Sequence, residues 1–254
     1  MNNRTIIYYT DDSLPDNFAS RIRELLLKSA GSISIISVSQ KPLDFGHNIC
    51  VGDIGRSHLS MYRQLLAGGE YIDSDYVVLA EHDCLYTPEH INWTPPQKDI
   101  FYYNINHWFA QWNSRRYKGE YSYYRRKPLS QLICAKDIFI KAVEEKVWLL
   151  QNGYMIRKGQ VGACEMGVVP NDEAFIRIFP CEPGVCDNRK EYIDALAQFK
   201  DLGKEIGHWK AKAFSTVLPN IDIRHGGNFS GRRRGRQYCY ELPYWGKLSE
   251  IFKG

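Results

Sequence analysis

The first third of the chain alternates between short apolar runs and segments in which apolar residues recur with helical spacing. Runs at residues 5–9, 33–38 and 76–80 have the length and composition of buried strands. Between them lie a helix that opens at residues 13–16, with Ser13 as its predicted cap, and a second helix over 57–67. Strand, helix, strand, helix, strand is the order of βαβ units, and it predicts a parallel sheet.

The pattern becomes mixed in the rest of the chain. Residues 41–55 contain Pro and Gly without a clear period, so we predict a loop there. A last strand is predicted to begin at Ile221. The other predicted elements are strands over 100–103 and 131–135 and helices over 138–150, 174–178 and 192–200.

Length and composition suit one folded domain. The chain has 254 residues, of which 44% are hydrophobic and 24% charged, which is ordinary for a globular protein. The βαβ order, followed by a mixed pattern, predicts an α/β protein with a Rossmann-like mixed sheet flanked by helices. The length predicts a single domain over residues 1–254. Because the pattern changes after residue 85, we divide this domain into two halves, 1–85 and 86–254.

Cysteine usage and hydropathy predict the compartment. The seven cysteines are odd in number and scattered, so we interpret them as reduced thiols of an intracellular protein. No run approaches the roughly 20 apolar residues of a membrane span, and the N-terminus lacks the apolar core of a signal peptide. We therefore expect a cytoplasmic protein that makes no membrane contact, and nothing in the sequence indicates an obligate protein partner.

Two carboxylates follow directly on the third predicted strand. Glu81 and Asp83 stand at its carboxyl end, where ligands bind in open α/β sheets. Their hard oxygen atoms suit Mg²⁺ or Mn²⁺ carrying a phosphate. His82 lies between them, and strand alternation predicts that it is a spacer that points away. The alternative interpretation is a solvated acidic turn.

Two further motifs carry similar chemistry. Asp172 and Glu173 stand at a predicted helix start, where backbone N–H groups and the helix dipole favour an ionised carboxylate. His225 is followed by a Gly-rich loop and then by a cluster of arginines that includes Arg232 and Arg233. Such a loop lets backbone amides approach phosphate oxygens, and Arg supplies paired donors.

The order of these motifs resembles the GT-A glycosyltransferases, over most of the chain. The resemblance implies that the N-terminal half binds a nucleotide-sugar, namely a UDP-sugar, and that the C-terminal half holds the acceptor and the catalytic base. It assigns the metal-binding DxD role to Glu81 and Asp83, with Glu in place of the first Asp, and a further metal contact to His225. It assigns the base of an inverting reaction to Asp172 or Glu173.

The same resemblance places the donor nucleotide at the end of the first strand. The residues that would face it are Tyr9, Thr10, Asp11 and Asp12, and Arg232 and Arg233 would close over the diphosphate. The alternative interpretation of Asp11 and Asp12 is that they only help to cap the following helix.

The segment 107–127 interleaves aromatic and basic residues around a single acid, and net charge is +4 overall. In GT-A enzymes the corresponding region shapes the acceptor site, which assigns acceptor binding to Trp108, Trp112, Arg115, Arg116, Tyr124 and Arg125. Arginines neutralise phosphates and aromatic rings stack on bases, so DNA is one candidate acceptor, as in the phage enzymes that glycosylate hydroxymethylpyrimidines. A carbohydrate acceptor, or an exposed hairpin whose tyrosines pack on the sheet, are the alternatives.

The sequence therefore predicts a metal-dependent glycosyltransferase of the GT-A type. A nucleotidyltransferase is the enzymatic alternative, because it also needs a metal–phosphate site on an α/β sheet. A nucleic-acid-binding module without an active site is the alternative from another class, based on the basic clusters alone.

Overall fold

The computed structural model describes residues 3–112, 115–123, 125–151, 166, 209–225 and 237–252. The helices are α1 (Asp16–Ala30), α2 (His58–Gly69), α3 (Pro88–Asn92), the 3-10 helix η1 (Leu129–Gln131), α4 (Lys136–Gln151) and α7 (Leu248–Ile251). The strands are β1 (Arg4–Tyr9), β2 (Ser34–Ser39), β3 (His47–Cys50), β4 (Tyr76–Glu81), β5 (Cys84–Leu85), β6 (Ile100–Asn104), β7 (His107–Gln111), β8 (Tyr121–Tyr123), β9 (Leu132–Ala135), β10 (Lys210–Phe214), β11 (Asn220–Arg224) and β12 (Gln237–Cys239).

A seven-stranded mixed sheet forms the centre of the fold, in the order β10-β6-β9-β4-β1-β2-β3. Strands β4, β1, β2 and β3 are parallel to one another, and β9 runs antiparallel between β4 and β6. Every residue of β1 is buried, because helices cover both faces of the sheet. The predicted α/β class, with a mixed sheet flanked by helices, is confirmed.

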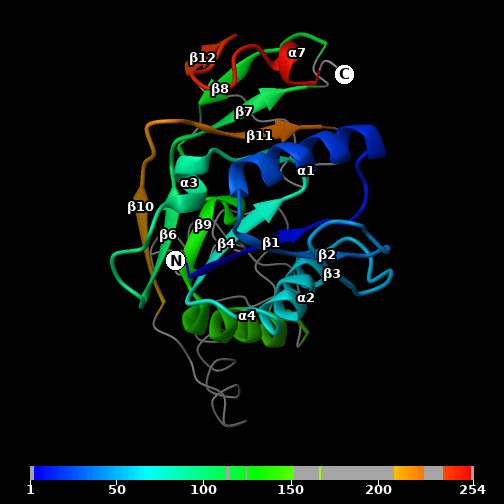
Figure 1. Cartoon of the computed structure of the whole chain (residues 1–254), viewed down its shortest axis with the longest axis vertical. Coiled ribbons are helices and arrows are strands. Elements are labelled where there is room, and N and C mark those ends of the chain that lie inside the picture. The colour runs from blue at the N-terminus through cyan, green and yellow to red at the C-terminus, as the bar shows by residue number, and fades with distance from the viewer. Residues whose placement is uncertain are drawn as a thin grey trace, which may run out of the picture.

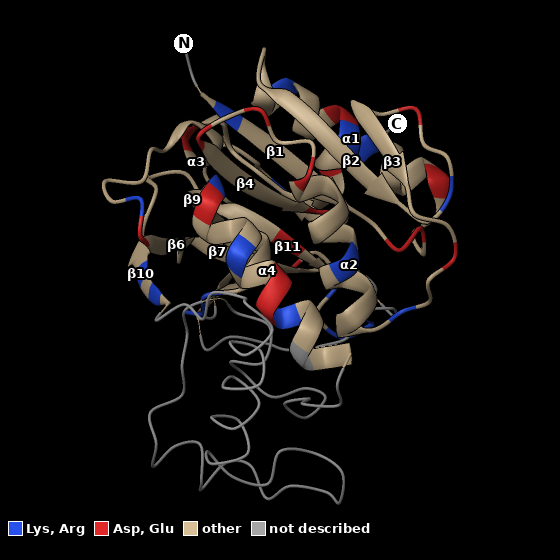
Figure 2. Ribbon diagram, turned by 90° about the horizontal axis from the view of Figure 1, so that it is seen from below, with Lys and Arg blue, Asp and Glu red and all other residues tan. Residues whose placement is uncertain are grey.

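The two faces of this sheet have separate apolar cores. Helices α2 and α4 lie on one face, where Tyr62 and Phe139 pack against Ile7 of β1 (Figures 1 and 2). Helices α1 and α3 lie on the opposite face, where Leu26 packs with Ile6. Ile6 and Ile7 point to opposite faces because side chains alternate along a strand.

A second, five-stranded sheet has the order β12-β8-β7-β11-β5. Its apolar face packs against α1, so this helix lies between the two sheets (Figure 1). Two residues separate the end of β4 from the start of β5, and Cys84 of β5 pairs with Asp222 of β11. The turn from β4 to β5 therefore joins the two sheets, and it carries the predicted acidic motif.

Most predicted elements are confirmed, and two details are wrong. The predicted loop over 41–55 contains β3, a short edge strand with polar residues that show no apolar period. Helix α1 begins after Pro15, and no side chain caps it, so Ser13 is not its cap. The helices predicted over 174–178 and 192–200 lie outside the described residues.

The described residues bear on two other predictions, which concern the cysteines and membrane-spanning helices. Of the seven cysteines, the four that the structure describes, Cys50, Cys84, Cys134 and Cys239, are free thiols. Among the described helices, none combines the length and the apolar character that a membrane crossing would need.

Candidate functional site

Three strands bring the candidate site together at their carboxyl ends. Tyr9 ends β1 and Glu81 ends β4, and the two residues are partners in the parallel ladder. The chain then turns at His82 and Asp83, and the backbone oxygen of Asp83 accepts a hydrogen bond from the N–H of Ile223 at 2.8 Å. This bond holds β11 against the turn, so His225, the first residue after β11, reaches the same place.

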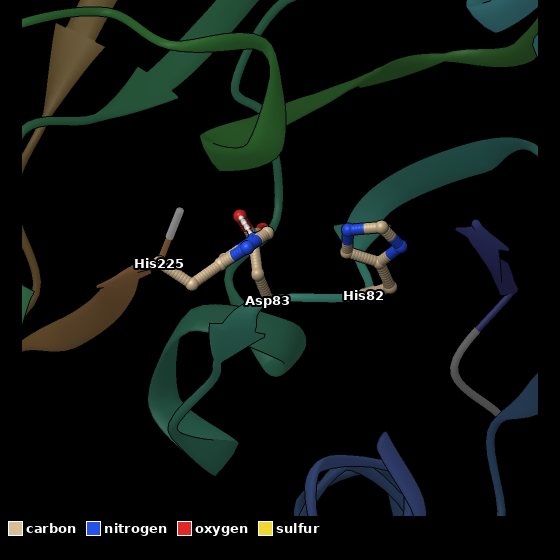
Figure 3. A group of neighbouring side chains, drawn as sticks. All are labelled: His82, Asp83 and His225. Atoms are coloured by element: carbon tan, nitrogen blue, oxygen red, sulfur yellow. Dashed lines mark ion pairs between the residues drawn. The ribbon is translucent and has the colours of Figure 1, made fainter. Parts of the chain in front are cut away.

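His82, Asp83 and His225 form a group that could hold a metal ion. One donor atom from each side chain lies within 4.8 Å of the other two. Figure 3 shows the imidazole of His225 against the carboxylate of Asp83, and Nε2 of His225 lies 3.3 Å from Oδ2 of Asp83. A second such group contains Glu81, Asp83 and Cys84, so Asp83 belongs to both.

The buried environment separates the protonation states of the two predicted carboxylates. Burial, together with the negative charges of Asp83 and Asp222, raises the pKa of Glu81 to about 8. Burial acts in the same direction on Asp83, but contact with His225 and the nearby charges of His82 and Arg224 outweigh it and lower the pKa of Asp83 to about 2. At neutral pH, Asp83 is therefore ionised and Glu81 is largely protonated.

Hydrogen bonds fix the Glu81 side chain and its backbone. The phenol of Tyr9 donates to Oε1 of Glu81 at 2.7 Å. The backbone N–H of Glu81 donates to the phenol oxygen of Tyr86 at 2.9 Å, and that phenol donates to the backbone oxygen of Ser130 at 3.0 Å. These contacts connect β1, β4 and η1 behind the acidic turn.

Asp222 is a third buried acid that sequence analysis missed. It lies on β11 opposite Cys84, and Arg224 donates a hydrogen bond to its Oδ1 at 3.1 Å. Burial and the charge of Asp83 raise the pKa of Asp222 to about 6, although Arg224 acts in the opposite direction. The alternation of Asn220, Asp222 and Arg224 with isoleucines on β11 is the sequence signal that could have indicated it.

The pKa of Glu81 predicts how the stability of the metal-free protein depends on pH. Folding raises this pKa above its ordinary value of 4.5, so the folded state holds a proton that the unfolded chain has released. The contribution is complete below pH 4.5 and is lost as the pH rises through about 8. We expect the free energy of unfolding to fall over this range, and Glu81→Gln to flatten the fall.

Urea unfolding at several pH values, with a chelator present, measures this effect. The raised pKa of Asp222 likewise makes the free energy of unfolding fall as the pH rises to about 6. The lowered pKa of Asp83 affects the free energy of unfolding only in more acidic solution. Glu24 is exposed on α1, and Glu24→Gln is the matched control that should keep the wild-type slope. An unchanged slope in Glu81→Gln would contradict the assignment of the proton to Glu81.

The residues after β1 lie beside the acidic turn. Oγ1 of Thr10 is 2.8 Å from Nδ1 of His82, and Oδ1 of Asp11 is 3.4 Å from the same nitrogen. Asp11 also pairs with Arg56, which sequence analysis did not single out. Asp12 instead accepts from the backbone N–H groups of Gln40 and Lys41 at 2.7 and 2.8 Å, so it holds the loop that follows β2.

The predicted acceptor residues lie on and around the hairpin of β7 and β8. Strands β7 and β11 are parallel, with Gln111 opposite Arg224, so this hairpin turns at the end of the small sheet that carries His225. The ring of Trp112 packs against Phe18 and Phe252, and Trp108 contacts Tyr123. The exposed predicted residues are Arg115, Arg116 and Arg125.

The remaining predicted site residues lie outside the described part of the chain. They are the acid pair, the two loop arginines and one tyrosine, namely Asp172, Glu173, Arg232, Arg233 and Tyr124. The structure therefore brings together the residues predicted at the ends of β1, β4 and β11. The roles assigned to the other residues stay predictions from the sequence.

No family model and no curated protein matches the chain. One similar solved structure is a glycosyltransferase involved in glycosylation of the major capsid of PBCV-1, with 12% identity, a TM-score of 0.41, and coverage of 89% of this chain and 95% of that one. Another is bifunctional IspDF from Campylobacter jejuni, with 11% identity, a TM-score of 0.33, and coverage of 56% and 43%.

A third is a mutant Drosophila β1,4-galactosyltransferase 7 in complex with manganese, UDP-Gal and xylobiose. It has 12% identity and a TM-score of 0.37, and the match covers 99% of this chain and 80% of that one. At such low TM-scores these likenesses carry no functional conclusion. The geometry of the site is therefore what indicates its chemistry.

Proposed function

We propose that this protein is a metal-dependent glycosyltransferase of the GT-A type, which moves a sugar from a UDP-sugar to an acceptor hydroxyl. The observation that carries the proposal is the meeting of Asp83 and His225 beside the end of β1. Carboxylate and imidazole donors suit a divalent metal, and the carboxyl ends of parallel strands are where α/β sheets bind ligands. The donor set therefore fits a cation that carries a diphosphate.

Each group in the site has a role in this proposal. Asp83 and His225 hold the metal, and Glu81 stands beside Asp83 as the other acid of the predicted motif. A bound Mn²⁺ or Mg²⁺ would act as a Lewis acid on the diphosphate leaving group. Thr10 and Asp11, at the end of β1, lie beside His82 and would face the nucleotide.

Four residues outside the described ranges are given roles in this proposal from the sequence alone. Asp172 or Glu173 takes the proton from the acceptor hydroxyl as it attacks, which corresponds to an inverting reaction. Arg232 and Arg233 donate hydrogen bonds to the phosphate oxygens.

Binding of nucleoside diphosphates, measured by calorimetry with and without Mn²⁺, tests this function. We expect UDP to bind more tightly when Mn²⁺ is present, because Asp83 and His225 would hold a cation that attracts the diphosphate. UDP that binds equally well in a chelator would contradict the proposal. Pyrophosphate release from a nucleoside triphosphate would identify a nucleotidyltransferase, and nucleic-acid binding without any nucleotide binding would identify a module that has no active site.

Fewer described residues indicate the acceptor than the donor. We propose DNA with hydroxymethylated bases as the acceptor to test first. The support is the exposure of Arg115, Arg116 and Arg125 around the β7–β8 hairpin, near the end of the sheet that carries His225. An unmodified base offers no hydroxymethyl group, so the reactive hydroxyl must belong to a modified base, which the enzyme would have to extrude from the helix. An oligosaccharide is the alternative acceptor.

Neutralising these three arginines together, as Gln variants, tests the DNA proposal. We expect DNA affinity to fall and its salt slope to shrink by about one unit for each lost phosphate contact. Donor hydrolysis should stay near the wild-type rate, because none of the three belongs to the metal site. Salt-dependent DNA binding, measured by fluorescence anisotropy, gives both quantities.

The matched control neutralises three exposed lysines from other segments, Lys28, Lys98 and Lys212, and should leave the salt slope closer to that of the wild type. Transfer to an oligosaccharide, with no DNA binding at low salt, would remove DNA as the acceptor. It would leave a glycosyltransferase that acts on carbohydrate.

A further inference from the structure

We propose that His82 is a ligand of the metal, so that the centre consists of two imidazoles and one carboxylate and selects a transition metal over Mg²⁺. This inference rests on the proposed function for what the metal does, but the ligand set itself follows from the geometry of the turn. It replaces the expectation that His82 is a spacer and that Glu81 supplies the ligand.

The position of the His82 ring is the first argument. Its Nδ1 lies 2.8 Å from Oγ1 of Thr10 and 3.4 Å from Oδ1 of Asp11, so this nitrogen is in contact with the two residues that follow β1. In Figure 3 one ring nitrogen of His82 faces Asp83 and His225, while the other points away from them. The nitrogen that faces the site is therefore Nε2, the one that Thr10 and Asp11 leave available.

The contact with Asp11 is the second argument. A histidine that binds a metal usually engages its other ring nitrogen with a carboxylate or a backbone oxygen, which fixes its tautomer and orientation. Asp11 is itself held by Arg56 and by the backbone N–H of Ser13 at 3.1 Å. The carboxylate that orients His82 is thus fixed by two partners of its own.

The spacing of the donor atoms is the third argument. Two ligand atoms that each lie about 2.1 Å from one metal are roughly 3–4 Å apart. The donor atoms of His82, Asp83 and His225 lie within 4.8 Å of one another, and the Asp83–His225 contact is 3.3 Å. The spacing of Asp83 and His225 is therefore already that of two ligands of one ion, and His82 lies next to this pair.

Glu81 is less suited to be the third ligand. Its Oε1 already accepts a hydrogen bond from Tyr9 at 2.7 Å. The group that contains Glu81 joins it with Asp83 and Cys84, and His225 is not in that group. Of the two groups, only the one with His82 joins the β4–β5 turn to the end of β11.

This ligand set predicts which metal binds. Mg²⁺ prefers oxygen ligands in near-ideal octahedral geometry, whereas imidazole nitrogen suits the divalent first-row transition metals. Two imidazoles among three protein ligands therefore favour Mn²⁺ or a later transition metal. We expect the purified protein to bind Mn²⁺ at least about tenfold more tightly than Mg²⁺.

Mn²⁺ binding to the full chain, followed by electron paramagnetic resonance, tests the proposal. We measure it with and without UDP, for the wild type, His82→Gln and the surface control Asp75→Asn, whose carboxylate forms an exposed ion pair with Lys98. Loss of an outer partner of a metal ligand typically weakens metal binding about 10–100-fold. Loss of the ligand in His82→Gln should therefore weaken Mn²⁺ binding by at least this much. Asp11→Asn removes only an outer partner and should weaken Mn²⁺ binding about tenfold. Asp75→Asn should keep the wild-type affinity.

Spin-echo spectra of the bound Mn²⁺ count the imidazoles directly. With ¹⁵N-labelled histidine, the wild type should show two coordinated nitrogens and His82→Gln one, and circular dichroism should show that both are folded. Wild-type Mn²⁺ affinity in folded His82→Gln, or no Mn²⁺ binding by the wild type with or without UDP, would overturn the proposal. Two coordinated imidazoles in a protein that never uses a UDP-sugar would overturn the proposed function alone.

Discussion

Replacing Asp83 by Ala is expected to abolish metal-dependent donor binding while the protein remains folded. Asp83 is shared by both groups that could hold a metal among the described residues, and its carboxylate stays ionised because His225, His82 and Arg224 are close. Loss of an outer partner of a metal ligand typically weakens metal binding 10–100-fold, so loss of a ligand should weaken it by at least about 100-fold. Calorimetric titration of UDP in the presence of Mn²⁺ measures the effect.

A surface carboxylate provides the control for this experiment. Asp75 forms an exposed ion pair with Lys98, and Asp75→Asn should bind UDP and Mn²⁺ as the wild type does. Circular dichroism and thermal unfolding establish whether each variant is folded. Unchanged Mn²⁺-dependent UDP affinity in folded Asp83→Ala would remove Asp83 from the metal site.

The second large effect is expected at the acid pair Asp172 and Glu173. If one of them is the general base, Asp172→Asn or Glu173→Gln should slow sugar transfer about 10²–10⁴-fold. Donor affinity should change little, because the base acts on the acceptor hydroxyl and not on the nucleotide. Single-turnover transfer rates, measured beside calorimetric donor affinity, separate the two quantities.

Glu24→Gln, which changes an exposed carboxylate of α1, is the control for a conservative change of charge. If both single variants transfer sugar at the wild-type rate, neither acid is the general base, and the prediction of an inverting reaction is contradicted. A loss of donor affinity equal to the loss of rate would instead place the pair in the donor site.

Strong local patterns explain why the central sheet could be predicted from the sequence. Strands β1 and β4 are apolar runs buried on both faces, and α1, α2 and α4 each show an apolar face at helical spacing. The carboxyl ends of parallel strands meet at one edge of a sheet, so the positions of Tyr9 and Glu81 followed from that topology.

The small sheet could not be predicted in the same way. Its strands have two to five residues, too few for a period to be visible, and β11 pairs with segments more than a hundred residues away in the chain. The meeting of Asp222 with the acidic turn depends on this long-range pairing. No local pattern around residue 222 specifies its partner strand.

The orientation of His82 was predicted wrongly for a physical reason. The prediction extended strand alternation past the end of β4, but the strand stops at Glu81 and the chain turns at His82 and Asp83. Side chains in a turn do not alternate between two faces, so neighbouring residues can point to one place. Both residues accordingly belong to the group that includes His225.

In the function proposed here, the site uses a nucleotide-sugar with the help of a divalent metal. The measurement that tests it most directly is the release of nucleoside diphosphate from a panel of nucleotide-sugars, with Mn²⁺ or with a chelator, by the wild type and by Asp83→Asn. We predict slow release of UDP from at least one UDP-sugar by the wild type with Mn²⁺, and none in the chelator or from the variant. No release from any donor, or equal release by the wild type and Asp83→Asn, would contradict the proposed function.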